Sequence, residues 1–249
     1  MIPLKTQEEI GIMAEGGRIL SGIMKKLSKL VKPGITTKDL DRVAETLIFK
    51  AGAEPSFKGQ QGYPASFCFS LNEKIVHGVP SESVLLKEGD IITLDIGMKY
   101  KGFHTDMAVT LPVGRVEPEI KRMIWVTRKA LKRAIKKVRP GNTFGDIGNT
   151  IQRYVESQGF NIIRELCGHG IGKDLHEDPQ ILNYGKRHIG PEIQEGMVFC
   201  IEPMVTKGDW RIKQSKDRIG YETFDGSWAA HFEQTVAVTK HGAKILTEI

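Results

Sequence analysis

The chain has 249 residues, with 36 Lys and Arg against 30 Asp and Glu and a formal net charge of +6 at pH 7. This length supports one large core, and the composition is that of an ordinary globular protein. The three cysteines have no paired spacing, which excludes a cysteine-rich zinc module and favours a reducing compartment, the cytoplasm by default. The N-terminus lacks a signal-peptide pattern, and no stretch approaches the roughly 18 apolar residues of a membrane span, so we expect no membrane anchoring.

Helices and blocks of strands are predicted to alternate along the first half. A capping box of Thr6 and Glu9 predicts a first helix that ends before Pro33-Gly34, and a second helix is expected over about 36–52. Alternating and apolar stretches then predict strands at about 65–71, 74–79, 91–98 and 103–113.

The second half repeats this order. Helices are predicted over about 117–138 and 143–159, followed by strands at about 161–167, 197–205, 230–239 and 244–248. Helices that alternate with antiparallel strands are typical of an α+β fold. No linker interrupts the pattern, so we expect one catalytic domain over 1–249, made of half-repeats at about 5–115 and 116–249.

The segment 121–139 is strongly basic, with nine Lys or Arg and no acidic residue. A solvated helix face is the simplest interpretation. Against it, basic residues such as Arg128, Lys132 and Lys136 recur at i,i+4, where like charges mildly destabilise a helix. A second hypothesis is that this face contacts a polyanion such as ribosomal RNA.

An internal repeat, displaced by 107 residues, relates the two halves. Pro33, Gly34, Thr36, Asp39 and Gly52 recur as Pro140, Gly141, Thr143, Asp146 and Gly159. The same offset relates Asp95, in EGDIITLDIG, to Glu202, in EGMVFCIEPM. A further acid follows each, Asp106 after 11 residues and Glu233 after 31. We interpret this as two half-domains with pseudo-twofold symmetry, each of which contributes two carboxylates to a shared interior.

Four carboxylates in apolar strands require partners. The strand around Asp95 is apolar on both faces, so an unpaired carboxylate there would cost several kcal/mol or take up a proton. A buried Arg or Lys is the usual partner for one such group, but the neighbouring sequence supplies no matching set of four bases. Two divalent ions cancel the charge of four carboxylates, whereas one ion does not. Two ions sharing carboxylates also lower the pKa of a water held between them, which is the chemistry of a two-metal hydrolase.

The motif GHGIGKDLHEDP offers a nitrogen ligand. His169 lies between two glycines, which permit close backbone approach to a site, and His176 follows seven residues later. Alone, each would be an ordinary loop histidine, but beside four carboxylates His169 is a strong ligand candidate. Four other histidines are interpreted as structural: His104, His188, His231 and His241. His104 and His231 nevertheless share a strand face with a ligand and could support it.

The chain closely resembles the type I, bacterial-style methionine aminopeptidases of the pita-bread fold, from about residue 4 onward. The resemblance is carried by NEKIVHGVP, GHGIGKDLHEDP, IEPM and HFEQTVAVT, together with Asp95, Asp106, His169, Glu202 and Glu233. It implies that Asp95 binds one divalent ion and His169 and Glu202 the other, while Asp106 and Glu233 bridge the two.

The resemblance also implies roles in substrate binding and catalysis. Glu202 is expected to act as general base, His77 to contact the scissile amide nitrogen and His176 to stabilise the tetrahedral intermediate. Tyr63 and Cys68 match the methionine pocket of the family. The chain departs from the pattern of some relatives at Phe57, Gln60, Leu175, Ile219 and Gln234.

The expected activity is removal of the initiator methionine from nascent polypeptide N-termini when the second side chain is small, by a monomeric enzyme. Four oxygen donors and one nitrogen suit Mn²⁺, Fe²⁺ or Co²⁺, with Zn²⁺ also open. By resemblance, Co²⁺ would be the usual laboratory activator and Fe²⁺ or Mn²⁺ the ion in cells. A thiolate site is not expected, because no cysteine belongs to the ligand set.

Two alternatives remain. Proline-specific exopeptidases of the same fold, the Xaa-Pro aminopeptidases and prolidases, share the ligand set, but they usually carry a sizeable N-terminal domain, whereas here the first helix begins at Thr6. A non-enzymatic homologue that binds the ribosome or RNA through 121–139 is the other. Such relatives lose metal ligands, and this chain keeps all five.

Overall fold

The computed structural model describes residues 2–248, which contain four α-helices. They are α1 (Gln7–Leu30), α2 (Thr37–Lys50), α3 (Pro118–Ile135) and α4 (Phe144–Ser157). All four confirm the predicted helices to within three residues. The capping box of Thr6 and Glu9 is formed, and matching boxes start α2 and α4 at positions related by the repeat.

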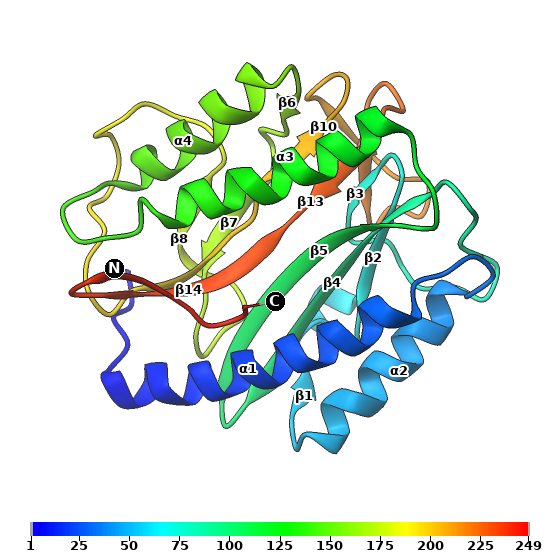
Figure 1. The fold of residues 1–249 in the computed structure, drawn as a ribbon. Coiled ribbons are helices and arrows are strands. Elements are labelled where there is room, and N and C mark those ends of the chain that lie inside the picture. The colour runs from blue at the N-terminus through cyan, green and yellow to red at the C-terminus, as the bar shows by residue number, and fades with distance from the viewer. Residues whose placement is uncertain (1, 249) are drawn as a thin grey trace.

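A nine-stranded antiparallel sheet forms the centre of the molecule (Figure 1). Its main path runs in the order β1 (Glu54–Pro55), β4 (Ile91–Tyr100), β5 (Phe103–Pro112), β14 (Glu233–Thr239), β9 (Val198–Ile201), β7 (Cys167–Gly170) and β8 (Glu177–Leu182). β2 (Cys68–Leu71) also pairs with β4, and β15 (Gly242–Ile245) with β14.

Two small sheets complete the architecture. One is β13 (Ala229–His231), β10 (Met204–Thr206) and β6 (Asn161–Ile162), and the other is β11 (Ile212–Gln214), β12 (Tyr221–Thr223) and β3 (Lys74–Val76). Within residues 2–248, no helix combines the length and apolar character needed to cross a membrane.

Several predicted strand boundaries were wrong. The strand expected over 197–205 is divided into β9 and β10 at Glu202 and Pro203, where the proline has no N–H to donate to a ladder. The strand expected over 230–239 is likewise divided into β13 and β14. The strand expected over 74–79 ends at Val76, because His77 takes a positive φ of 59°. The strand expected over 161–167 is divided into β6 and β7, and four strands were not predicted at all: β1, β8, β11 and β12.

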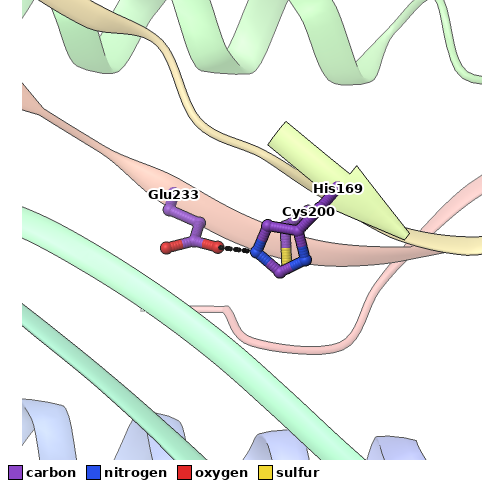
Figure 2. A group of neighbouring side chains, drawn as sticks. All are labelled: His169, Cys200 and Glu233. Atoms are coloured by element: carbon purple, nitrogen blue, oxygen red, sulfur yellow. Dashed lines mark ion pairs between the residues drawn. The ribbon is translucent and has the colours of Figure 1, made fainter. Parts of the chain in front are cut away.

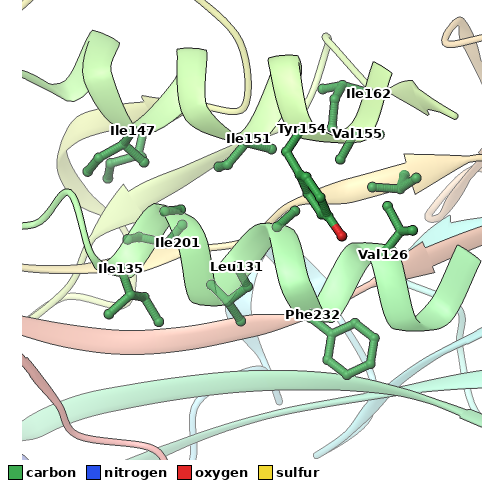
Figure 3. Close-up of a cluster of buried hydrophobic side chains, with 14 of the residues drawn as sticks. Val126, Leu131, Ile135, Ile147, Ile151, Tyr154, Val155, Ile162, Ile201 and Phe232 are labelled. Atoms are coloured by element: carbon green, nitrogen blue, oxygen red, sulfur yellow. The ribbon is translucent and has the colours of Figure 1, made fainter. Parts of the chain in front are cut away.

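Each helical pair packs on its own part of the sheet (Figure 1). α1 and α2 bury Leu20, Leu27 and Leu40 with β4 and β5 side chains such as Leu94. α3 and α4 bury a second cluster with strands of the second half, drawn in Figure 3. Its members include Val126, Leu131, Ile147, Ile151, Val155, Ile201 and Phe232. The boundaries of the half-repeats themselves stay a prediction.

Candidate metal centre

Strand register brings the four acidic residues together. Asp95 of β4 lies opposite Ala108 of β5, which in turn lies opposite Glu233 of β14. Directly paired residues point to the same face of a sheet, and Asp106 shares that face because it is two residues from Ala108. Glu202 directly follows β9, the strand beside β14. We call Asp95, Asp106, Glu202 and Glu233 the acidic cluster.

The acidic cluster is buried, and no Lys or Arg within residues 2–248 forms an ion pair with it. Carboxylate oxygens of Asp95, Asp106 and Glu233 lie within 4.8 Å of one another. Among residues 2–248, the only groups that form ion-pair contacts with the cluster within 4.0 Å are His169 and His231. Burial is the main cause that raises the pKa of each carboxyl, to about 7 for Asp106 and well above the usual range for the other three, with mutual repulsion adding to it at those three.

Unpartnered oxygens in this cluster fit a metal. Oδ1 of Asp95 and Oε1 of Glu233 are buried without a hydrogen-bond partner in the described residues. Buried carboxylates in such an arrangement are stable only when a proton or a cation compensates their charge. Hard oxygen donors of this kind suit divalent ions, so the residues fit the expected cofactor.

His169 completes the predicted ligand set. Its Nδ1 donates a hydrogen bond to the carbonyl oxygen of Gly170 at 2.9 Å. Its Nε2 lies 3.7 Å from Glu202 Oε1 and 4.0 Å from Glu233 Oε1, the second contact being drawn in Figure 2. Burial lowers the pKa of His169 to about 4, so the ring is neutral at pH 7 and Nε2 keeps a free lone pair. A backbone hydrogen bond at one nitrogen is the usual way to aim the other at a metal.

Two buried side chains that the sequence reasoning missed hold the acidic residues in place. The Thr235 hydroxyl accepts from the backbone N–H of Asp106 at 2.9 Å and donates to the carbonyl oxygen of Asp106 at 2.8 Å. The Asn183 amide donates to the carbonyl oxygen of Glu202 at 2.9 Å. The motif HFEQT contains Thr235, but its contact with Asp106 is visible only once β5 and β14 are placed side by side.

The ligand set lies on the wall of a cavity of about 890 Å³. The predicted substrate-binding residues line the same cavity: His77, His176, Tyr63 and Cys68. Four positions where the chain departs from its relatives line it too: Phe57, Gln60, Leu175 and Ile219. The Tyr63 hydroxyl donates to the carbonyl oxygen of Gly78 at 2.7 Å, which fastens the turn that carries His77. The His176 ring packs edge-on against His169, with 4.4 Å between ring centroids.

The other four histidines lie in three different settings. His231 is buried beside the acidic cluster, with Nε2 3.6 Å from Glu202 Oε2, and burial lowers its pKa to about 3. His104 instead bonds Ser56 Oγ through Nδ1 at 2.8 Å and lines a neighbouring cavity of about 490 Å³, which shares Gln60, Leu175 and His176 with the first. His188 and His241 are exposed.

Cys200, which the sequence reasoning left out of the ligand set, lies beside two predicted ligands. Its Sγ, a His169 ring nitrogen and a Glu233 carboxylate oxygen all lie within 4.8 Å of one another (Figure 2). The cause is register: Cys200 pairs with Thr235, two residues from Glu233, and so faces the same side of the sheet.

Comparison with known proteins agrees with this chemistry. A model of metallopeptidase family M24 matches residues 11–240. The chain belongs to metallopeptidase family M24. Among curated members, it is 47% identical to methionine aminopeptidase 1 of Bacillus subtilis (strain 168), with all of both chains covered. It is 39% identical to methionine aminopeptidase of Escherichia coli (strain K12), over 99% of this chain and 94% of that one.

Solved structures of the family confirm the predicted pita-bread fold. A methionine aminopeptidase of Thermotoga maritima superposes with a TM-score of 0.98 at 43% identity, covering all of both chains. The predicted resemblance to methionine aminopeptidases is thereby confirmed. The prolidase of Pyrococcus furiosus reaches a TM-score of 0.81 at 24% identity and is covered over 65% of its length, so it shares the fold alone.

Proposed function

We propose that this protein is a type I methionine aminopeptidase that removes the initiator methionine from nascent polypeptide N-termini. The observation that carries the proposal is the acidic cluster with His169 on the wall of a cavity large enough for a peptide N-terminus. Full-length relatives named methionine aminopeptidase support the substrate. With three free cysteines, we place this activity in the reducing cytoplasm, carried out by a monomer.

Two divalent ions are the proposed cofactor. Asp95 would hold one ion, His169 and Glu202 the other, and Asp106 and Glu233 would bridge them. When bound, such ions act as Lewis acids and supply a nucleophilic water near neutral pH. Co²⁺, Mn²⁺, Fe²⁺ and Zn²⁺ all suit oxygen and imidazole donors, and the occupancy of the two positions is part of the proposal.

The protein side chains would provide proton transfer and orientation. Glu202 is the proposed general base, because it joins the cluster and its carboxylate also approaches two neutral imidazoles. His77 and His176 line the cavity beside the ligands. We propose that His77 contacts the scissile amide nitrogen and that His176 stabilises the developing oxyanion. Both are neutral near pH 7, since burial lowers the pKa of each.

The methionine side chain would occupy the part of the cavity lined by Tyr63 and Cys68. Phe57, Leu175 and Ile219 add apolar surface there, which suits an unbranched thioether. A small second side chain is the proposed preference beyond the scissile bond.

Steady-state cleavage of Met-Gly-Met and of an Xaa-Pro dipeptide separates this proposal from the proline-specific alternative. We expect kcat/KM to be higher for Met-Gly-Met by on the order of 100-fold, the discrimination that an apolar pocket provides. The enzyme should be assayed with each candidate metal in turn, so that a poor metal is not mistaken for a poor substrate. Faster cleavage of the proline substrate would overturn the assignment.

A ribosome contact through 121–139 is a second proposal about partners. The bases of this segment lie on α3 and in the turn that follows it and are largely exposed, and among residues 2–248 none of them forms an ion pair with an acidic side chain within 4.0 Å. Trp125 is 54% exposed on the same helix, and Lys129 lies over its ring. Unneutralised bases beside an exposed aromatic ring suit a nucleic-acid surface better than a purely solvated face.

Charge reversal of Arg128, Lys132 and Lys136 to Glu is expected to weaken ribosome binding and to flatten its salt dependence, because the salt slope falls by about one for each phosphate that the protein no longer neutralises. Turnover of Met-Gly-Met should not change. The matched control reverses Lys25, Lys26 and Lys29, three exposed bases of α1. Cosedimentation with ribosomes at several salt concentrations measures both variants. Equal weakening by both, or by neither, would leave the solvated-face interpretation standing.

A further inference from the structure

Cys200 lies among the groups that would bind metal. It is the third residue of β9, pairs with Thr235 of β14, and is 0% exposed. In Figure 2 the sulfur overlaps the outline of the His169 ring, and the Glu233 carboxylate points toward the same ring. The ligand atoms of these three residues, one nitrogen, one sulfur and one oxygen, lie within 4.8 Å of one another.

The sulfur of Cys200 has lone pairs that are free to bind a metal. Its hydrogen-bond contact is with the Thr235 hydroxyl at 3.4 Å. That hydroxyl already donates its proton to the carbonyl oxygen of Asp106, so across the contact the thiol must be the donor. No donor is therefore directed at the sulfur lone pairs. Among residues 2–248, Oε1 of Glu233, in a side chain that is 3% exposed, likewise has no hydrogen-bond partner, and its nearest ion-pair contact is His169 Nε2 at 4.0 Å.

We propose that Cys200 is an additional metal ligand on the His169 side of the centre, a role that rests on the proposed metal-dependent function. On coordination the thiol proton leaves to solvent and the sulfur binds as thiolate. A sulfur donor changes the preference of this position, because thiolates favour Zn²⁺ and Co²⁺ over Mn²⁺, which prefers oxygen. The oxygen-and-nitrogen set inferred from sequence would have predicted no such bias.

The competing explanation is that Cys200 is only a buried apolar side chain whose thiol bonds a neighbour. It makes a different spectroscopic prediction. A thiolate bound to Co²⁺ produces a ligand-to-metal charge-transfer band in the near ultraviolet, whereas a thiol that merely packs nearby produces none.

Titration of metal-free protein with Co²⁺, followed by absorption and by metal analysis, is the test. We expect the charge-transfer band in the wild type and its loss in Cys200→Ser. Cys167→Ser is the matched control, because Cys167 lines the cavity that holds the acidic cluster but does not belong to the group with His169 and Glu233. It should keep the band. A Co²⁺-loaded wild type without the band, or a Cys200→Ser variant that retains it, would overturn the proposal.

Metal competition gives a second measurement that does not depend on cobalt. Replacing Cys200 by Ser or Thr should reduce the affinity for Zn²⁺ relative to Mn²⁺ by at least about tenfold, as expected when a metal site loses a supporting group. Circular dichroism verifies folding, and the Thr variant serves if the Ser variant is unstable. An unchanged affinity ratio in a folded variant would count against the ligand role.

The same samples separate this inference from the proposed function. If the wild type binds Co²⁺ and cleaves Met-Gly-Met but shows no charge-transfer band, only the role of Cys200 fails. If the wild type binds no divalent ion, or if His169→Ala binds Co²⁺ as tightly as the wild type, the metal centre itself has been assigned wrongly.

Discussion

Replacing Glu202 with Gln is expected to give a folded protein with almost no peptidase activity. A carboxamide has nearly the same size, so packing around the buried side chain is kept, but it cannot accept a proton or supply a negative charge to a metal. Loss of a general base alone lowers kcat by about 10²- to 10⁴-fold. Loss of a metal ligand adds to this. Steady-state kinetics on Met-Gly-Met, with metal content measured on the same sample, provides the comparison.

Glu165→Gln is the matched control for that variant. Glu165 is exposed, and its side chain takes no part in the hydrogen bonds or ion pairs found among residues 2–248. The Glu165→Gln variant should therefore be as active as the wild type. His169→Ala should lose as much activity as Glu202→Gln. In this variant the loss comes from weaker metal binding alone, because His169 is proposed as a ligand and not as a base. Full activity in either site variant would refute the assignment of the centre. Circular dichroism verifies that an inactive variant is still folded.

Local signals predicted the helices well because they are encoded over a few neighbouring residues. The capping box of Thr36 and Asp39 recurs as that of Thr143 and Asp146, and both start a helix where predicted. The acidic cluster could also be predicted, since Asp95 interrupts an otherwise apolar strand and a lone buried charge demands a partner.

Features that depend on strand register could not be predicted. Cys200 and Thr235 are 35 residues apart, and only the pairing of β9 with β14 shows that they share a face. β8 escaped prediction because Pro179 argues against a strand interior. The structure explains the exception: β8 is at the edge of the large sheet, and Pro179 lies at a register shift between Glu177 and Gln180, where it has no partner in β7.

The metal-free protein is expected to lose stability as the pH rises from about 6.5 to 8. Burial raises the pKa of Asp106 from 3.8 to about 7 in the folded state, and it raises the pKa values of the other three members of the acidic cluster well above their usual range. The folded protein therefore binds more protons than the unfolded chain in this range. A carboxyl with a raised pKa contributes stability that is complete below its unfolded pKa and is lost as the pH rises through its folded pKa.

The neighbouring histidines fix the pH window. The pKa values of His169 and His231 are lowered to about 4 and about 3, so these groups gain stability as the pH rises toward 6.5 and oppose the carboxyls below that value. Histidines of the unfolded chain are half protonated at pH 6.5 and mostly neutral by about pH 7.5, so their opposing effect fades across this window and the carboxyls dominate its upper part. Each proton released then costs roughly 1 kcal/mol per pH unit. For a chain of this size, each kcal/mol lowers Tm by about 2–4 °C.

Divalent metal should reverse this dependence. Metal requires the ionised carboxylates, so its stabilising effect grows over the same window in which the metal-free protein weakens. Thermal unfolding of chelator-treated and Mn²⁺- or Co²⁺-loaded protein between pH 6.5 and 8 measures both curves. Glu233→Gln should flatten the decline of the metal-free protein, whereas Glu165→Gln should keep it. A metal-free protein whose Tm stays constant or rises over this window would mean that the acidic cluster is neutralised by something other than protons or metal.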